Sequence, residues 1–133
     1  MRIDPEMAWE VREALMEFKS TGKHVVIYID TADFVVYNFA AIADRIVMNP
    51  VGALVLRAPA ASKFYLSGTL KKIGVAFDEL RFFKYKSAAE IFSREKMSDA
   101  DREQTKEYID EYYNLLKQQI CEARKISAQD FDK

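Results

Sequence analysis

Hydrophobic positions near the start of the chain follow helical spacing. Asp4 suits the N-cap of a helix and Pro5 suits the first helical position. The apolar positions that follow lie three or four residues apart, at Met7, Val11, Leu15 and Phe18, with Ala8 and Ala14 beside them. Gly22 favours a helix end. The pattern therefore predicts a helix from Pro5 to about Gly22 that buries this apolar stripe.

Continuous apolar runs in the middle of the chain are typical of short, buried strands. The run His24–Ile29 consists mainly of β-branched and aromatic residues. Such a run is typical of a strand in a parallel sheet whose two faces are both covered. A turn at residues 31–33 and a short helix at residues 34–43 follow. Further strands are expected at Arg45–Met48, Ala53–Leu56 and Val75–Tyr85, with a turn at residues 49–52 and a helix at residues 61–73.

The last third of the chain predicts one long helix. Ser98–Asp101 resembles a capping box, and an apolar face follows at Ile109, Tyr112, Tyr113, Leu116, Ile120 and Ala123. The expected fold class is α/β, with a small, mostly parallel sheet, helices packed on it and the long C-terminal helix laid across the sheet or onto a partner. Residues 1–133 read as a single domain. About four short strands are few for independent stability, so we expect a piece of a longer protein.

Composition narrows the function classes. The 133 residues include 20 Lys and Arg against 21 Asp and Glu, a net charge of −1, so no global basic field and no nucleic-acid partner are expected. The single cysteine, Cys121, excludes an internal disulfide, and one cysteine with one histidine, His24, cannot form a four-ligand zinc site. With His24 as its only histidine, the chain is not expected to use histidine catalysis. No cofactor is expected. The uncharged stretches are too short to span a bilayer, and the acidic N-terminus does not resemble a signal peptide.

A lysine before a predicted helix start is the main chemical candidate. Ser87 and Glu90 have capping-box spacing, which would place Lys86 at the positive end of a helix, among aromatic residues and near Lys84. These surroundings favour a neutral amine, the form that acts as a general base. In the alternative reading, Lys86 ends a strand and stays solvated. Ser87 is better explained as a helix cap than as a nucleophile.

Other reactive side chains have plain structural explanations. Asp30 and Asp33 flank the expected turn after the first strand, where turn chemistry and capping account for them. Cys121 is expected to be a buried or inert thiol.

The segment around Lys86 resembles a known family. FKYKSAAEIFSREKMSDADREQ is similar to the YKSA-x-E-P-F signature of the signal peptide peptidases called SppA or protease IV. ADRIVMNPVGALVLRA, FYLSGTLKKIGVAFDEL and CEARKIS resemble the same family in the same order. The resemblance covers nearly the whole chain and fits the N-terminal of the two tandem halves of the long form. It implies a ClpP/crotonase-like α/β fold.

The resemblance also implies a Ser-Lys dyad peptidase in which Lys86 is the general base. In halves that carry the nucleophile, Ser-Gly-Gly follows the first strand, but this chain has Phe34 nearest the serine position, followed by two valines. The serine is therefore expected from the C-terminal half of the same polypeptide, and this chain alone should be inactive. Phe82-Phe83 replaces the family's Val-Gly and Ile91 replaces its proline, which bears on the shape of the substrate groove.

The resemblance further implies cleaved signal peptides or other extended apolar peptides as substrates. It also implies a homo-oligomer, a tetramer in the family, and a place on the extracytoplasmic face of the bacterial cell membrane with the anchor outside this chain. The rival reading is a degenerate, non-catalytic half that serves as a scaffold or oligomerisation module, and it is motivated by Phe34. An acyl-CoA-binding crotonase relative fits less well, because no catalytic Glu/Asp pair stands at a recognisable oxyanion turn.

Overall fold

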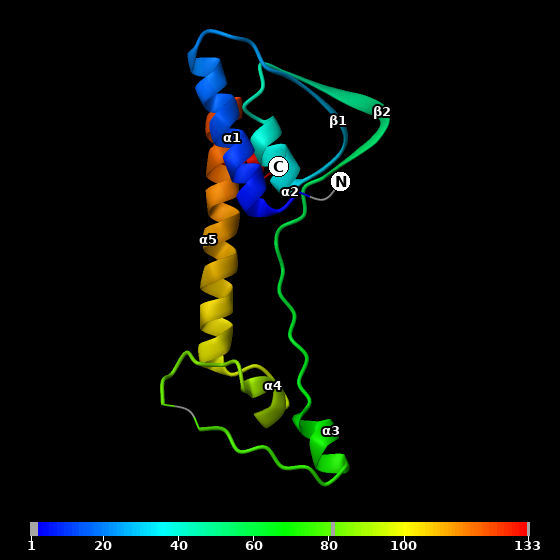
Figure 1. Cartoon of the computed structure of the whole chain (residues 1–133), viewed down its shortest axis with the longest axis vertical. Coiled ribbons are helices and arrows are strands. Elements are labelled where there is room, and N and C mark those ends of the chain that lie inside the picture. The colour runs from blue at the N-terminus through cyan, green and yellow to red at the C-terminus, as the bar shows by residue number, and fades with distance from the viewer. Residues whose placement is uncertain (1–2, 81, 133) are drawn as a thin grey trace. The chain divides into compact units, whose positions relative to one another are not determined.

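The structure, a computed structural model, describes residues 3–80 and 82–132 (Figure 1). In that part of the chain the elements are α1 (Pro5–Ser20), β1 (Val26–Asp33), α2 (Phe34–Ala40), β2 (Arg45–Val55), α3 (Ser67–Lys72), α4 (Glu90–Ser93), α5 (Asp99–Arg124) and α6 (Ala128–Phe131). They fall into two compact units, the first Met1–Ala58 with Tyr112–Lys133 and the second Pro59–Glu111. The α/β class and the long C-terminal helix are confirmed. The single domain over residues 1–133 stays a prediction.

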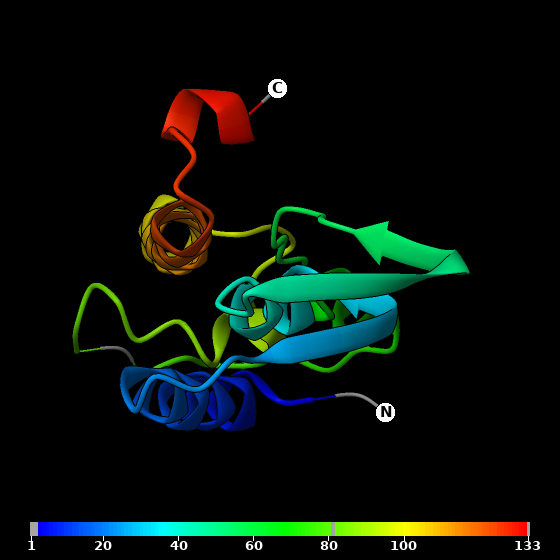
Figure 2. The ribbon, with the colours of Figure 1, turned by 90° about the horizontal axis from the view of Figure 1, so that it is seen from above.

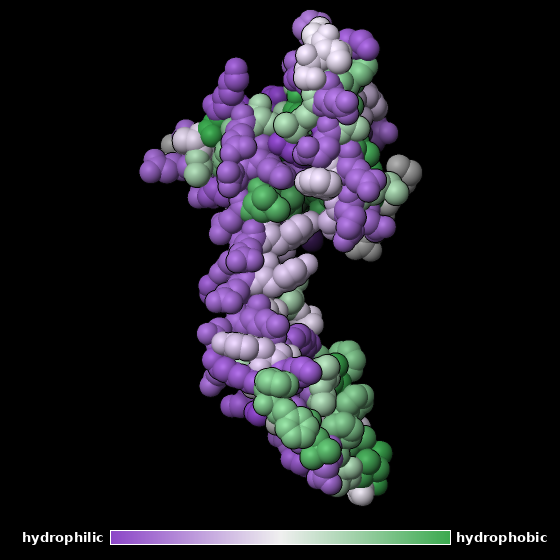
Figure 3. Space-filling view, turned by 60° about the vertical axis from the view of Figure 1, so that its left-hand side comes forward, coloured by the Kyte–Doolittle hydropathy of each residue, from purple (hydrophilic) through white to green (hydrophobic). Residues whose placement is uncertain are grey.

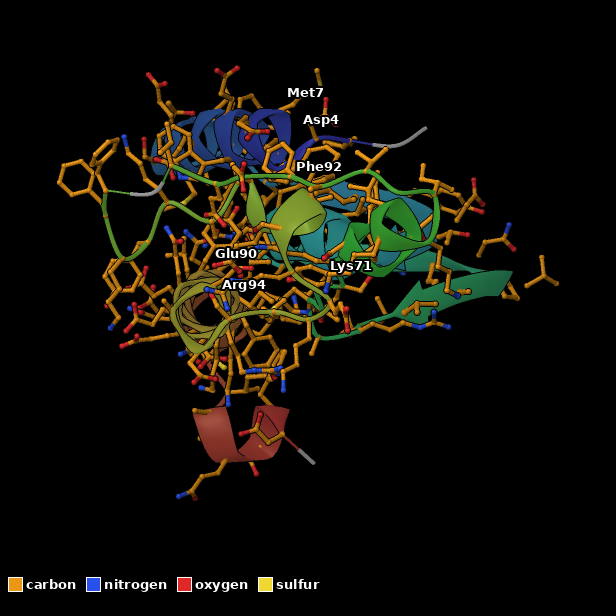
Figure 4. All side chains as sticks on the ribbon, turned by 90° about the horizontal axis from the view of Figure 1, so that it is seen from below. Asp4, Met7, Lys71, Glu90, Phe92 and Arg94 are labelled. Carbon is orange, nitrogen blue, oxygen red and sulfur yellow. The ribbon has the colours of Figure 1, made fainter. Side chains whose placement is uncertain are left out.

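Helix α1 has the predicted ends, and its buried side matches the predicted stripe in part. Pro5 occupies its first turn, and Gly22 beyond its C-terminus adopts a φ of +82°. Ala8 is buried and Val11 and Leu15 are half-buried, as the stripe predicts. Met7, however, is 54% exposed and lies on the outer side of the helix (Figure 4), and the polar Arg12 is buried.

The burial of Arg12 is explained by its polar contacts. The Arg12 guanidinium donates to the backbone oxygen of Asn38 at 2.7 Å and to that of Gln119 at 3.3 Å. Burial lowers the pKa of Arg12. Its two carbonyl partners supply the hydrogen bonds that a buried charge requires, and a hydrophobicity pattern does not register them.

The sheet of the first unit consists of two parallel strands, β1 and β2, that lie side by side (Figure 2). The register pairs Ile29 with Met48 and then Thr31 with Ala53, so an irregularity at residues 49–52 faces Asp30. Gly52 is required there, because a Cβ atom would lie 2.0 Å from the Asp30 carbonyl oxygen.

Three strand predictions need correction in this unit. The two strands expected at residues 45–48 and 53–56 are one strand, because both pair with β1 on either side of the irregularity. The turn expected at residues 31–33 continues β1. The expected sheet of about four strands has two in the described residues.

Helix α2 begins immediately after β1. The Asp33 side chain accepts a hydrogen bond from the Val36 N–H at 2.9 Å, which confirms the capping role expected for Asp33. The apolar face of α5 packs on α2, where the sequence predicted packing across the sheet or onto a partner. Their common core contains Phe34, Ala41, Leu116 and Ile120, with Tyr112, Tyr113 and Ala123 packed against it.

In the second unit, the strand expected at Val75–Tyr85 is irregular in its described residues, and Arg81 lies outside them. No strand in the described chain runs beside this segment to supply ladder hydrogen bonds. Its large side chains are exposed instead, with Leu80 at 88% and Phe82 at 84% (Figure 3). This strand prediction was therefore wrong for the described residues.

The helix expected at residues 61–73 begins only at Ser67. Tertiary contacts hold the preceding residues outside a helix: the Leu66 N–H donates to the Ile91 carbonyl at 2.7 Å, and Lys63 forms an ion pair with Asp101 at 2.6 Å. These contacts override the local helical propensity. Among the described residues, no helix has the length and hydropathy needed to cross a membrane.

Asp44 joins α1 to the start of the sheet. Its carboxylate lies 2.8 Å from the Lys19 ammonium and accepts the Val25 N–H at 2.8 Å. The hydrogen bond from Lys19, followed by that from Val25, lowers the pKa of Asp44 from 3.8 to about 2.

Since the folded form binds this proton less tightly than the unfolded chain, Asp44 stabilises the fold above its ordinary pKa. That stabilisation is lost as the pH falls through about 2. Urea unfolding should therefore show wild type more stable than Asp44→Asn at pH 7, with the difference shrinking towards pH 2. Glu17→Gln, an exposed change on α1, is the control. A difference that stays constant with pH would contradict the assignment.

Candidate active site

Lys86 lies in the segment between α3 and α4. The segment turns tightly here, because the Lys86 N–H donates to the Phe83 carbonyl at 3.3 Å and the Ser87 N–H donates to the Tyr85 carbonyl at 3.1 Å. The Lys86 side chain is exposed, and its Nζ lies 5.2 Å from the centre of the Phe83 ring. A cation–π contact of this kind holds the amine at the aromatic surface.

Lys86 lines a cavity of about 580 Å³. Its walls are largely apolar and come mostly from the same segment, including Leu80, Phe82, Phe83 and Ala88, and Gln104 of α5 also lines it. Glu79 and Ser87 are further polar residues in the wall. Largely apolar walls with a few polar groups are typical of ligand-binding sites.

The predicted capping box does not form. The N-cap of α4 is Ala89, which makes no side-chain cap bond, and α4 has only four residues. The Ser87 hydroxyl donates to Asp101 Oδ1 at 2.6 Å instead. Ser87 lies two residues before this N-cap, too early in the chain to cap α4, so the local prediction was wrong. Lys86 is therefore not placed by a capped helix end.

The neighbouring Lys84 is occupied elsewhere. Its Nζ lies 2.9 Å from the Tyr85 hydroxyl and 3.0 Å from Glu103 Oε2. These hydrogen bonds, first to Tyr85 and then to Glu103, raise the pKa of Lys84, so this lysine stays charged.

Two buried carboxylates, Glu90 and Asp101, lie beside the Lys86 segment. Asp101 is 2% exposed and accepts hydrogen bonds from Lys63 Nζ and from the Ser87 hydroxyl, both at 2.6 Å and both to Oδ1. Glu90 is 1% exposed and accepts from the Ser98 hydroxyl at 2.7 Å. Sequence reasoning missed the roles of Lys63 and Asp101.

Ser98 links these two carboxylates. It caps α5 as predicted, since its hydroxyl accepts the Asp101 N–H at 3.1 Å. Its own N–H donates to Glu90 Oε2 at 3.3 Å. Arg94, the residue after α4, lies beside Glu90 (Figure 4), with its Nε 3.6 Å from Oε1. The start of α5 is thereby fixed to the segment that carries Lys86.

The position expected for a nucleophile in related halves holds a core residue. Phe34 is the first residue of α2 and is 6% exposed. Its ring stacks on Tyr113 at 5.5 Å between centroids and meets Phe131 edge-on at 6.0 Å. It has no group to acylate, and its packing explains its presence.

The other sequence candidates take structural places. Asp30 accepts a hydrogen bond from the Asn49 side chain at 2.8 Å, and the His24 side chain is 88% exposed. The Cys121 sulfur lies 3.9 Å from the Ser127 carbonyl oxygen. In the part of the chain that the structure describes, no three His, Cys, Asp or Glu residues are grouped as metal ligands would be.

The chain is similar to named proteases. It is 30% identical to Protease 4 of Haemophilus influenzae over 113 residues, which are 85% of this chain. It is 32% identical to Protease 4 of Salmonella typhi over 125 residues, which are 94% of this chain. It is 27% identical over 119 residues, 86% of this chain, to the chloroplastic serine protease SPPA of Arabidopsis thaliana. The chain spans 18–20% of the length of these relatives.

A family match covers most of the chain and agrees with these relatives. Residues 17–133 match peptidase family S49. The relatives named Protease 4 and SPPA confirm the expected resemblance to SppA, or protease IV. The chain belongs to peptidase family S49.

Proposed function

We propose that this chain is part of a Ser-Lys dyad signal peptide peptidase, within the N-terminal of two tandem halves. Lys86 is the general base in this proposal, and the nucleophilic serine comes from the C-terminal half of the same polypeptide. The observation that carries the proposal is the Lys86 amine at the wall of an apolar cavity, inside the YKSA motif of a peptidase-family chain.

The proposed reaction needs one amine and one hydroxyl. The neutral Lys86 amine removes the proton from the serine hydroxyl, and the serine oxygen attacks the carbonyl carbon of the scissile peptide bond. The resulting ammonium then gives its proton to the leaving amine as the C–N bond breaks. Water hydrolyses the acyl-enzyme in a second step with the same base, which restores the serine.

The cavity supports an apolar substrate. Phe82 and Leu80 are more than four-fifths exposed and line the same cavity as Lys86. An extended apolar peptide, such as a cleaved signal peptide, would bury these side chains, and burial of apolar area is the main driving force of such binding. We further propose that the enzyme is a homo-oligomer on the extracytoplasmic face of the bacterial cell membrane.

The isolated chain should be inactive, because it places Phe34 where related halves have their serine. A fluorophosphonate probe should label the full-length enzyme at one serine in the C-terminal half and leave this 133-residue chain unlabelled. Peptide hydrolysis should follow the same pattern. Labelling of a serine within this chain, at a rate that matches the full-length enzyme, would contradict the proposed division of the dyad.

A second candidate function is a non-catalytic scaffold or oligomerisation module. The burial of Phe34 at the junction of β1 and α2 favours it, since this part of the chain is built as a core. In that case the full-length protein would remain active after changes at Lys86. The same variants therefore separate the two functions.

A further inference from the structure

We propose that Asp101 is a positioning residue for the Lys86 amine, an inference that rests on the function proposed above. Asp101 reaches the Lys86 segment through Ser87, whose hydroxyl donates to Asp101 Oδ1 at 2.6 Å. Ser87 directly follows Lys86 in the chain. A hydrogen bond at Ser87 therefore fixes the backbone where the Lys86 side chain begins.

Asp101 is itself rigidly held. It is 2% exposed and lies in the first turn of α5, where its N–H donates to the Ser98 hydroxyl at 3.1 Å. Ser98 is bound in turn by Glu90, at 2.7 Å from its hydroxyl and 3.3 Å from its N–H. The Glu90 N–H donates to the Ser87 carbonyl at 3.0 Å and closes the network on the segment.

Lys63 supplies the charge that a buried carboxylate needs. Its Nζ lies 2.6 Å from the same Asp101 oxygen that accepts the Ser87 proton. Without such a partner, burial of a carboxylate is costly, and hydrogen bonds to ionised groups are the strong ones. Burial, followed by the charge of Asp101, raises the pKa of the adjacent Tyr65, so that hydroxyl remains neutral beside the ion pair.

Lys84 is also bonded to α5, at 3.0 Å from Glu103 Oε2, but Ser87 is the bonded residue that directly follows Lys86. A lysine side chain has four flexible carbons, and a general base works only within hydrogen-bond reach of the proton that it removes. Displacement of a catalytic group by about 1 Å costs roughly 100-fold in rate. The bond between Ser87 and Asp101 restrains that displacement.

The test uses the full-length enzyme and a peptide substrate. Ser87→Ala removes the link and leaves the Lys63–Asp101 pair and the α5 cap in place. We expect kcat to fall by about tenfold or more while KM stays within about twofold. The reason is that the change displaces the base and leaves the other substrate contacts in place. Ser87→Thr retains the hydroxyl and should restore most of kcat. Asp101→Ala, which removes the acceptor itself, should lower kcat at least as much.

The matched control is Ser127→Ala. It also removes a serine-to-aspartate hydrogen bond, of 2.7 Å to Asp130, but at the N-cap of α6. It should leave kcat unchanged. A wild-type kcat in Ser87→Ala, or a loss that Ser87→Thr does not restore, would overturn the positioning role. Failure of the proposed function is separate, since it would show as near-normal turnover in Lys86→Ala.

Discussion

Lys86→Ala in the full-length enzyme is expected to lower kcat by about 10²–10⁴-fold, the usual contribution of a general base. Lys86→Arg should be equally inactive, although it preserves the length and charge of the side chain. An arginine guanidinium is not deprotonated in proteins and cannot accept the serine proton. Steady-state peptide hydrolysis over a range of substrate concentrations would measure both kcat and KM.

Lys84 provides the matched control for this experiment. It lies two residues from Lys86, has the same side chain and is paired with Glu103 at 3.0 Å. Lys84→Ala should keep kcat within a few-fold of wild type, since surface ion pairs contribute little. If both Lys86 variants turned over at near-normal rates, the dyad would be excluded and the scaffold function would be favoured.

Phe34→Ala is expected to destabilise the chain by about 3–5 kcal/mol, the cost of removing a large buried aromatic side chain. Phe34 is 6% exposed and contacts Tyr113 and Phe131 across the core of the first unit. Phe34→Ser should cost at least as much, because it also buries a hydroxyl in an apolar site. Urea unfolding of the 133-residue chain would measure both effects.

Phe34→Ser should also gain no reactivity towards a fluorophosphonate, because the serine would lie in the apolar core of the first unit. Phe64→Ala is the control, since Phe64 is 69% exposed and its removal should change the free energy of unfolding by less than about 0.5 kcal/mol. Equal costs for Phe34→Ala and Phe64→Ala would contradict the assignment of Phe34 to the core.

Elements with local signals were predictable. The ends of α1 follow from Pro5 and Gly22, and the start of α5 follows from Ser98, because caps act within a few residues. Strand pairing is not local. The continuity of β2 across residues 49–52 depends on β1, and the segment at residues 75–85 has strand-like composition without a pairing partner in the described chain.

The candidate site was predictable only in part. The YKSA motif identified Lys86, but the polar network around it joins residues far apart in sequence. Lys63 and Asp101 are 38 positions apart and meet only in the folded chain. Ser87 is bonded to Asp101, and Arg12 is buried through its bond to the Asn38 carbonyl. A local sequence pattern does not register such contacts.

The most direct test of the lysine's role is one distance in the crystal structure of the full-length enzyme. The atoms are Lys86 Nζ and the Oγ of the serine that a fluorophosphonate labels. We expect them to lie about 2.6–3.2 Å apart, the hydrogen-bond reach of a nucleophile and its base. A labelled serine whose Oγ is instead bonded to another base, with Lys86 turned into solvent, would contradict the account.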